Sequence, residues 1–237
     1  MKIVEPSHRI LNKISEGGIE ELKLIEECAR TSYRSEDRIT EDGESAKIMV
    51  EKLIKNGHES CLEHSSMSVI FVCDRAIANE LERHRLASFT QESTRYVNVK
   101  AEKLGADGEM QVILPKDLQK GYDFWRKLNS DSGEKIKVSD YDAMEYLKYL
   151  EFKDSVEYDE TKYENMVSNK IPPEIARSVL PLSLATKVAM TANYREWRHI
   201  FKLRCEEHAH PDMRDLMIPL LHEAKQRIPV VFDDIPY

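Results

Sequence analysis

One stretch of the sequence decides how the chain is interpreted, and it consists of Arg83-His84-Arg85-Leu86-Ala87-Ser88-Phe89-Thr90-Gln91-Glu92-Ser93-Thr94-Arg95-Tyr96. Arginine presents a planar fork of N–H donors that suits phosphates and the carbonyl groups of an imide ring. A turn rich in Ser and Thr offers hydroxyls and backbone N–H groups to the same anion. The stretch therefore predicts a site for a phosphorylated, flat, heteroaromatic ligand, and the alternative is a solvated basic end of a helix.

Composition restricts the classes of protein that need to be considered. The chain has 237 residues and a formal net charge of -8, which argues against a general nucleic-acid binder with a broad basic footprint. No apolar run approaches the length of a membrane span, and the first residues have no apolar signal core. The four cysteines are scattered without paired spacing, so we expect a soluble protein in the reducing cytoplasm.

The apolar pattern indicates a mixture of helices and strands. Helical spacing predicts helices over residues 19–32, 44–56, 139–150, 173–180, 195–208 and from 211 to just before 229. Asp74 is expected to cap a further helix that runs to about residue 85. Runs of β-branched and aromatic residues predict strands over residues 67–73, 96–99, 110–114 and 183–192. We expect a single catalytic domain over residues 1–237, in which residues 116–169 are a helical insertion or a variable region.

A second segment contains several side chains that can bind a ligand or a metal, and its sequence is His58-Glu59-Ser60-Cys61-Leu62-Glu63-His64. His58, Cys61 and His64 are spaced by three and could approach one metal ion on a helical turn. The histidines are too far apart for the His-Glu-x-x-His pattern of a zinc protease. Metal binding and a purely structural His/Glu network both stay open as alternatives.

The expected helix over residues 195–208 places a charge on an apolar face. At about 100° per residue, Trp197, Ile200 and Phe201 define that face, and Arg204 and His208 fall on it. His199 points away from it. A core-facing arginine is costly unless it pairs with an acidic side chain or lines a polar cavity that binds an anion.

The spacing of the first stretch resembles the signature of the flavin-dependent thymidylate synthases. The pattern is Arg-His-Arg, two residues, Ser, four residues, Ser, one residue and Arg. With Gly57, the second segment resembles another family motif, and the resemblance extends from about residue 29 to residue 210. It implies reductive methylation of dUMP to dTMP, with methylenetetrahydrofolate as carbon donor and NADPH-reduced FAD as hydride donor. It also implies a homotetramer whose active sites are shared between subunits, with no nucleic acid or membrane as partner.

The resemblance assigns expected roles to individual residues, and it implies no metal. The expected flavin-binding residues are Ser32, His58, Ser60, Glu63, Arg83, His84, Arg85, Gln91, Asn193 and His199. The expected nucleotide-binding residues are Glu80, Arg83, Gln91, Glu92, Ser93, Thr94, Arg95, Arg177 and Arg204. Arg204 is also the expected catalytic residue, because it matches the arginine thought to favour the ionised N3 form of uracil.

Some positions depart from the family pattern. Glu80 stands where several relatives have Gln, and a carboxylate there would repel phosphate unless an arginine neutralises it. Thr90-Gln91 replaces the common Asn-Glu. An alternative interpretation for Arg177 is an ion pair with Glu174, three residues earlier.

The expected fold class is α+β, with a twisted, mainly antiparallel sheet flanked by helices. The chain has neither Gly-x-Gly-x-x-Gly nor a phosphate-binding Gly-x-x-x-x-Gly-Lys-[Ser/Thr], so the expected flavin-binding domain is not of the Rossmann type. Two other functions remain possible from the sequence. One is a nucleotide- or RNA-binding module, and the other is a metallohydrolase that uses His58/His64 or His208/His210.

Overall fold

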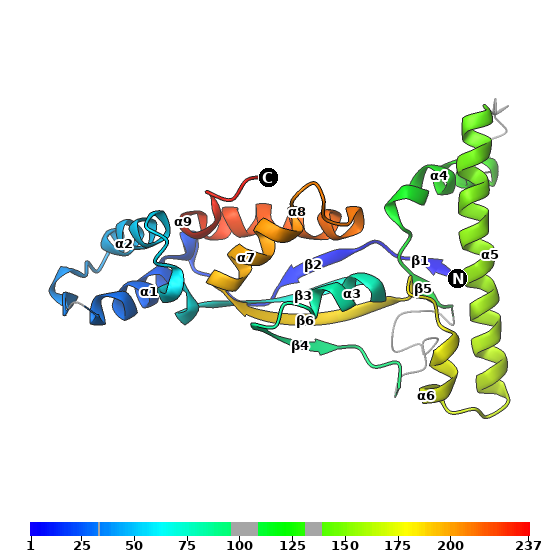
Figure 1. The fold of residues 1–237 in the computed structure, drawn as a ribbon, viewed down its shortest axis with the longest axis horizontal. Helices are drawn as coiled ribbons and strands as arrows, with labels where there is room; N and C mark the ends of the chain where they lie inside the picture. The colour runs from blue at the N-terminus through cyan, green and yellow to red at the C-terminus, as the bar shows by residue number, and fades with distance from the viewer. Residues whose placement is uncertain (33, 96–108, 131–138) are drawn as a thin grey trace. The chain divides into compact units, whose positions relative to one another are not determined.

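A computed structural model describes residues 1–32, 34–95, 109–130 and 139–237 (Figure 1). The chain folds into two compact units. Unit one comprises Met1–Glu5, Cys73–Ala78 and Glu92–Thr186, and unit two comprises Pro6–Val72, Asn79–Gln91 and Lys187–Tyr237. The single catalytic domain expected over residues 1–237 stays a prediction, and the strand expected over residues 96–99 lies outside the described residues.

A four-stranded sheet has the order β2 (Ser7–Ile10), β3 (Ser66–Asp74), β6 (Ala185–Asn193) and β4 (Ala87–Gln91). β2 pairs with β3 and β4 pairs with β6, and both pairings are antiparallel. Alternate residues of β3 are buried, as expected for a strand with one face against a core. The mixed helix-and-sheet class is therefore confirmed, as are the strands predicted over residues 67–73 and 183–192.

The strand β4 corrects the expectation for the stretch that follows Arg85. Ser88 and Thr90 are exposed while Ala87, Phe89 and Gln91 are half-buried, so the segment alternates with the period of a strand. Among the described residues of this stretch, a turn is present at residues 94–95. Thr and Phe favour a pleated, half-buried surface, and that preference outweighs the turn tendency of Ser.

Unit two contains most of the helices and its own aromatic core. Its helices are η1 (Glu16–Gly18), α1 (Ile19–Thr31), η2 (Glu36–Arg38), α2 (Glu44–Lys55), η3 (Glu59–His64), α7 (Tyr194–Arg204), α8 (Pro211–Arg227) and α9 (Pro229–Phe232). Helices α7 and α8 cover one face of the sheet (Figure 1). Trp197 lies 6.4 Å from Phe71 and 5.5 Å from Phe201 between ring centroids, and its Nε1 donates to the Met67 carbonyl at 2.9 Å.

Two helices end earlier than the sequence predicts. Helix α3 (Arg75–Leu81) stops four residues before the expected end near residue 85. Its start is as expected, because Asp74 Oδ1 accepts a hydrogen bond from the Ile77 amide at 2.7 Å. Helix α7 ends at Arg204, so the expectation that His208 lies on its apolar face is wrong, and His208 is exposed. Pro211 disfavours helical geometry in the residue before it, and the chain turns ahead of that point.

Unit one combines a small sheet with a helical pair. Its elements include β1 (Lys2–Ile3), parallel to β5 (Gln111–Val112), and then η5 (Lys116–Leu118), α4 (Gln119–Leu128), α5 (Asp140–Ser168), α6 (Pro173–Ala176) and η6 (Arg177–Val179). Ser139 and Asp142 form a capping box at the start of α5, a helix much longer than the predicted 139–150. Gly121 lets α4 approach α5 closely, because a Cβ there would lie 2.1 Å from the Glu145 carbonyl oxygen. In the described parts of residues 116–169, most of the chain is therefore helical.

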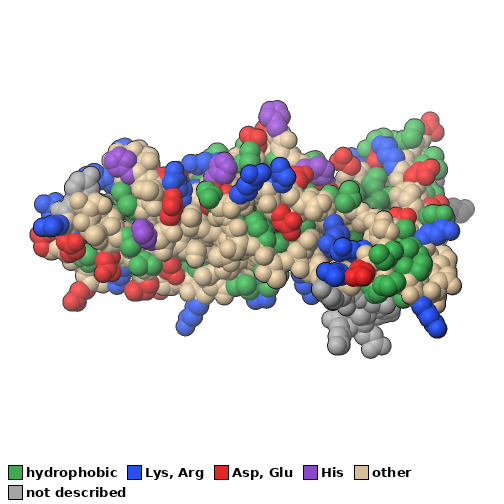
Figure 2. All heavy atoms as spheres, turned by 60° about the horizontal axis from the view of Figure 1, so that its bottom comes forward, with side chains coloured by type: hydrophobic (Ala, Val, Ile, Leu, Met, Phe, Trp, Pro, Cys, Tyr) green, Lys and Arg blue, Asp and Glu red, His purple; other side chains and the backbone are tan. Residues whose placement is uncertain are grey.

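No helix among the described residues is both long enough and apolar enough to cross a membrane. Figure 2 shows acidic and basic side chains close together over much of the face that it draws.

Candidate active site

The three residues Arg83, His84 and Arg85 point in different directions. They lie in the short connection between α3 and β4, which turns through hydrogen bonds from Arg83 N to Glu80 O and from His84 N to Leu81 O. His84 is buried, whereas both arginines are exposed. The connection therefore offers two arginines to a ligand and places one imidazole inside unit two.

Arg204 joins His84 to Glu80. Its Nε donates to His84 Nε2 at 3.0 Å, its Nη1 donates to Glu80 Oε2 at 2.8 Å, and its Nη2 donates to the Glu80 carbonyl at 3.1 Å. The Arg204 side chain is 17% exposed. The interpretation as an ion pair applies, because an acidic partner is present. Two of the five guanidinium N–H groups have no partner in the described part of the chain, and whether they meet a ligand stays a prediction.

Glu80 therefore does not face the site as a bare negative charge. The expectation was that a carboxylate at this position needs an arginine to neutralise it, and Arg204 does so. Whether Glu80 contacts a nucleotide stays a prediction.

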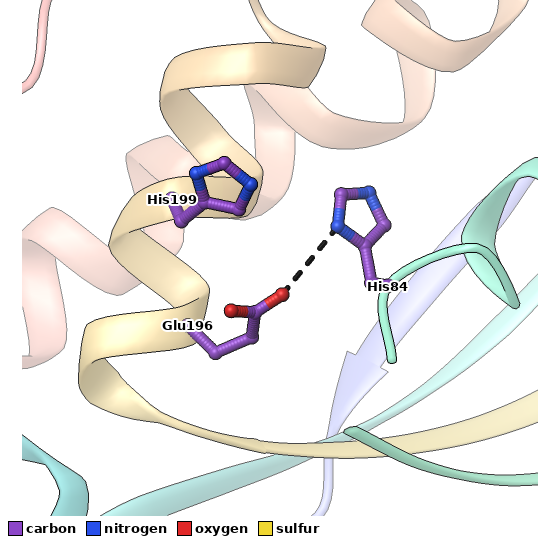
Figure 3. A group of neighbouring side chains, drawn as sticks. All are labelled: His84, Glu196 and His199. Carbon is purple, nitrogen blue, oxygen red and sulfur yellow. Dashed lines mark ion pairs between the residues drawn. The ribbon is translucent and has the colours of Figure 1, made fainter. Parts of the chain in front are cut away.

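His84 faces two further side chains of α7, Glu196 and His199, which Figure 3 shows turned towards it. His84 Nδ1 lies 3.6 Å from Glu196 Oε1, and the rings of His84 and His199 meet edge to face at 6.1 Å between centroids. Burial, followed by the charges of Arg204 and His199, lowers the pKa of His84 to about 4. Burial raises the pKa of Glu196, and the nearby His199 and Arg195 oppose that shift. His84 is therefore a neutral imidazole at pH 7.

The ligand atoms of His84, Glu196 and His199 lie within 4.8 Å of one another, which is close enough for a metal ion. However, Arg204 Nε donates to His84 Nε2, so the proton of the neutral ring is on Nδ1, the atom that would have to bind the ion. This arrangement favours hydrogen bonding over metal ligation. Within the described ranges, His58, Cys61 and His64 do not form such a group, and neither do His208 and His210 with a third ligand.

The first of two pockets borders this cluster and is called pocket A. It has a volume of about 520 Å³ and is lined by Glu59, Glu63, Leu86, Asn193, Arg195, Glu196, His199 and Lys202. Glu63, Asn193 and His199 were expected near a flavin. Asn193 also caps α7 by accepting from the Glu196 amide at 2.8 Å, and Arg195 pairs with Glu63 at 2.6 Å. Three of the expected residues are thus brought together at one pocket.

The second pocket, pocket B, has a volume of about 630 Å³ and brings together three other expected residues. Its lining residues are Ala29, Arg30, Ser32, Ser35, Arg38, Met49, Lys52, Leu53, Asn56, His58, Ser60 and Cys61. The side chains of Arg38 and Lys52 have no ion-pair partner in the part of the chain that the structure describes. Two available cations among serine hydroxyls suit an anionic group such as a phosphate.

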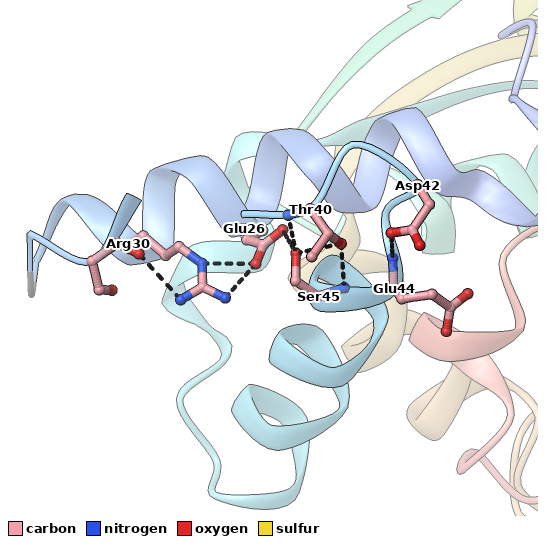
Figure 4. A network of polar contacts seen from close by, with 7 residues as sticks. Glu26, Arg30, Thr40, Asp42, Glu44 and Ser45 are labelled. Carbon is pink, nitrogen blue, oxygen red and sulfur yellow. Dashed lines mark hydrogen bonds and ion pairs between the residues drawn. The ribbon is translucent and has the colours of Figure 1, made fainter. Parts of the chain in front are cut away.

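A polar network holds the wall of pocket B. Figure 4 shows Glu26 and Arg30 of α1 connected to Ser45 at the start of α2. Arg30 donates to Glu26 at 2.7 Å, and Ser45 donates to the other Glu26 oxygen at 2.8 Å. Glu26 is fully buried, so these bonds offset the cost of placing its charge in the interior.

The expected residues Arg95 and Arg177 contact Glu174 in unit one, which also contains Glu92, Ser93 and Thr94. Arg95 Nε donates to Glu174 Oε2 at 3.0 Å, and Arg177 Nε donates to the Glu174 carbonyl at 3.2 Å. The suggested ion pair between Arg177 and Glu174 is therefore a hydrogen bond to the backbone. Ser93 Oγ accepts from the Arg95 amide at 3.2 Å, and Thr94 is buried.

A family model described as "Thymidylate synthase complementing protein" matches residues 19–230. The chain belongs to this family. A flavin-dependent thymidylate synthase from Corynebacterium aurimucosum is 29% identical over 94% of this chain and 83% of its own length. A flavin-dependent thymidylate synthase from Pyrococcus abyssi is also 29% identical, over 87% of this chain and 75% of its own length.

The fold is also similar to that of a solved structure. A UMP/dUMP methylase, PolB from Streptomyces cacaoi, bound with 5-Br dUMP, matches with a TM-score of 0.72 and 21% identity. The match covers 98% of this chain and 96% of that chain. At this level of identity the likeness concerns the fold.

For this member of the thymidylate synthase complementing family, sequence reasoning missed several pocket residues. Arg38 and Lys52 of pocket B carry no pattern that marks them. Glu196 of pocket A had a detectable signal, because it lies four residues before the core residue Ile200 and therefore on the same side of the helix.

Proposed function

We propose that the protein is a flavin-dependent thymidylate synthase that converts dUMP to dTMP by reductive methylation. Methylenetetrahydrofolate is the carbon donor, and NADPH-reduced FAD is the hydride donor. Family membership and the names of the curated relatives support the reaction. The structural observation that carries the proposal is the contact of Arg204 with His84, because it joins the expected catalytic arginine directly to the Arg83–Arg85 signature.

The two pockets supply donor groups that fit a flavin with a phosphate-containing tail. In pocket B, Ser32, His58 and Ser60 accompany the cations Arg38 and Lys52, which would hold the phosphates. In pocket A, Asn193 and His199 would hold the flavin together with Glu63. Because the sequence has no Rossmann glycine pattern, a flavin bound here would need a site of another type. When bound, reduced flavin supplies the hydride and the folate supplies the one-carbon unit.

The protein's own part in the reaction is positioning and electrostatics. The two N–H groups of Arg204 that have no partner in the described part of the chain would donate to the uracil ring and stabilise its ionised N3 form. Glu80, Arg83, Arg177 and the residues from Gln91 to Arg95 would hold the rest of the nucleotide, with the arginines on its phosphate. A neutral His84 keeps its proton on Nδ1 and leaves Nε2 as the acceptor that orients Arg204.

We also propose that the active form is a cytoplasmic homotetramer with shared active sites. Of the expected flavin residues of one chain, Glu63, Asn193 and His199 line pocket A, whereas Ser32, His58 and Ser60 line pocket B. Arg83 and Arg85 are exposed on the single chain, as residues that complete a site with another subunit would be.

The absorption spectrum of the purified protein tests the cofactor, with FAD added if the protein is colourless. A flavin band that saturates on titration is expected, followed by dTMP formation from dUMP, methylenetetrahydrofolate and NADPH. A protein that fails to bind FAD and forms no dTMP would contradict the proposal. Salt-dependent RNA binding without flavin, or a stoichiometric metal, would then favour one of the two alternative functions.

A further inference from the structure

Glu196 is a nearly buried carboxylate that the proposed reaction does not yet use. It is 7% exposed, it lies on α7 and it borders pocket A. Its carboxylate receives no hydrogen bond from a protein group in the described part of the chain. Placing a charge in the interior without such bonds is costly, and Glu26, the other buried acid among the described residues of unit two, accepts hydrogen bonds from Arg30 and Ser45. The position of Glu196 therefore requires a reason other than stability.

The partner of Glu196 is the ring of His84. Because Arg204 Nε–H donates to His84 Nε2, the proton of the neutral ring must be on Nδ1. That Nδ1–H faces Glu196 Oε1 at 3.6 Å (Figure 3). This separation is longer than a formed hydrogen bond, but such contacts are often long in an enzyme without its ligands and tighten in the complex. The carboxylate and the guanidinium thus favour the same tautomer from opposite sides of the ring.

We propose that Glu196 is a positioning residue that holds His84 in its Nδ1–H tautomer and thereby fixes the guanidinium of Arg204. The inference rests on the proposed function only where it concerns turnover, because the link between Glu196 and His84 exists in the free protein. Loss of the carboxylate leaves only the Arg204 contact in favour of Nδ1–H and thereby weakens that preference. The ring can then place its proton on Nε2, where it opposes the Arg204 Nε–H, and the arginine loses the bond that sets its orientation.

The charged neighbours do not offer Glu196 a better partner. On α7, Arg195 pairs with Glu63, and Lys202 lies 3.9 Å from Glu59. His199 lies on the same helix, and its ring contacts His84. The hydrogen bonds of Arg204 go to His84 and Glu80. Among the described groups, His84 is the one with a nitrogen in close contact with the Glu196 carboxylate, at 3.6 Å from Nδ1 to Oε1.

Histidine ¹⁵N NMR of the full-length protein in the form in which it purifies tests the link without any assay of the reaction. The His84 signals are assigned by their loss in His84→Asn. At pH 7 the parent is expected to show a neutral ring with its proton on Nδ1. Glu196→Ala should show a weaker preference, with part of the ring protonated on Nε2, and Glu196→Gln should keep the parent's preference, because the amide oxygen still accepts and the side chain keeps its shape. Glu207→Gln, an exposed change just after α7, is the matched control and should match the parent.

Steady-state kinetics provide the second measurement. For Glu196→Ala, kcat for dTMP formation should fall by about tenfold to a hundredfold, as for loss of one positioning hydrogen bond, with a smaller change in the KM for dUMP. Glu196→Gln should recover most of the loss. A parent whose His84 ring carries its proton on Nε2 at pH 7 would overturn the proposal without any variant. So would a folded Glu196→Ala with the parent's tautomer and kcat. If the parent forms no dTMP, the proposed function fails, and the NMR result still decides the role of Glu196.

Discussion

Two clusters in this chain contain an ion pair between an arginine and a glutamate, and the two ion pairs differ in how far they are exposed to solvent. In unit two, Arg204 bonds to Glu80 and His84 with only 17% of its side chain exposed. In unit one, Arg95 pairs with Glu174, and the two side chains are 53% and 46% exposed. Water screens the second cluster, so its ion pair contributes about 0–1 kcal/mol and is easily exchanged for a ligand's anion. In the first cluster, three hydrogen bonds hold the Arg204 guanidinium, to His84 Nε2, to the Glu80 carboxylate and to the Glu80 carbonyl.

A third arginine, Arg198, extends this comparison to a structural role. Its side chain is 1% exposed, and it makes a two-pronged contact with Asp234 at 2.6 and 2.7 Å, a bond to the Val231 carbonyl and a bond to Glu59. Arg198→Ala should lower the free energy of unfolding by about 3–5 kcal/mol, because it leaves acidic partners uncompensated. Urea unfolding measures this change. Arg227→Ala, which removes an exposed pair with Glu223, should change stability little. Equal losses in free energy of unfolding in the two variants would show that the burial of the arginine does not determine the size of the loss.

The second-largest effect is expected for Arg204→Lys. Lysine keeps the charge but loses the planar fork, so it cannot bond to His84, to Glu80 and to a nucleotide at the same time. The loss in transition-state stabilisation for dTMP formation should be about 2–4 kcal/mol, while the fold survives. The ratio kcat/KM for dUMP gives the loss, and thermal unfolding checks the fold. Turnover equal to that of the parent would make Arg204 only a structural partner of Glu80.

The third effect is a pH dependence of stability that belongs to the buried cluster. Burial, Arg204 and His199 lower the pKa of His84 from 6.5 to about 4, so the unfolded state binds a proton that the native state excludes. Stability should therefore fall as the pH decreases from about 6.5 towards 4, by on the order of 2 kcal/mol from this group. Urea unfolding of the parent and of His84→Gln at several pH values measures the contribution. Between about pH 6.5 and pH 4, His84→Gln should lose less stability than the parent. If the free energy of unfolding depends on pH in the same way in both proteins, the lowered pKa of His84 is not the cause.

The sequence predicted the elements that have a strong local pattern. Helices α1 and α2 follow from the spacing of their apolar residues, and β3 follows from its β-branched run. Strand β4 was missed because its serine and threonine suggest a turn, whereas its pairing with β6 is non-local. The helical wheel correctly placed Trp197, Ile200 and Phe201 in the core.

The sequence marked some residues of the candidate site but not the contacts between them. The spacing of Arg83, His84 and Arg85 and the apolar face of α7 marked two parts of it. Arg204 meets Glu80 across 124 positions of sequence, and such a contact depends on the fold. No pattern in one sequence joins them, so the sequence left the ion pair and the ligand site as alternatives, and the structure shows the ion pair.

The fourth prediction concerns the exposed ion pair between Arg95 and Glu174, whose loss should change stability less than the changes above. Arg95→Ala should change the free energy of unfolding by less than about 1 kcal/mol, because its pair with Glu174 is solvated. If Arg95 holds the nucleotide phosphate, the KM for dUMP should rise by about tenfold, which corresponds to loss of one charge-assisted hydrogen bond. Glu174→Gln is the matched control, since it breaks the same pair but leaves the cation, and its KM should not rise. A rise in both variants would indicate that the pair itself organises the loop.

The smallest effect on turnover is expected for the cysteines, which the proposed mechanism does not use. A cysteine nucleophile has to be a thiolate placed against the uracil ring. Burial raises the pKa of both Cys73 and Cys205 to about 12, so these thiols stay protonated at pH 7. Cys61 lines pocket B, where the proposed ligand is the flavin, and Cys28 lies on α1.

Changing each cysteine to Ser should therefore leave dTMP synthesis intact. The four single variants are Cys28→Ser, Cys61→Ser, Cys73→Ser and Cys205→Ser. The two buried positions should lose some stability, because Ser places a hydroxyl where the thiol packs as an apolar group. Turnover is compared at a temperature at which every variant is folded, and FAD and dUMP binding are measured separately. One folded variant that binds both ligands and forms no dTMP would identify a cysteine nucleophile. Catalysis would then depend on a cysteine thiolate in addition to the electrostatic stabilisation of the uracil ring by Arg204.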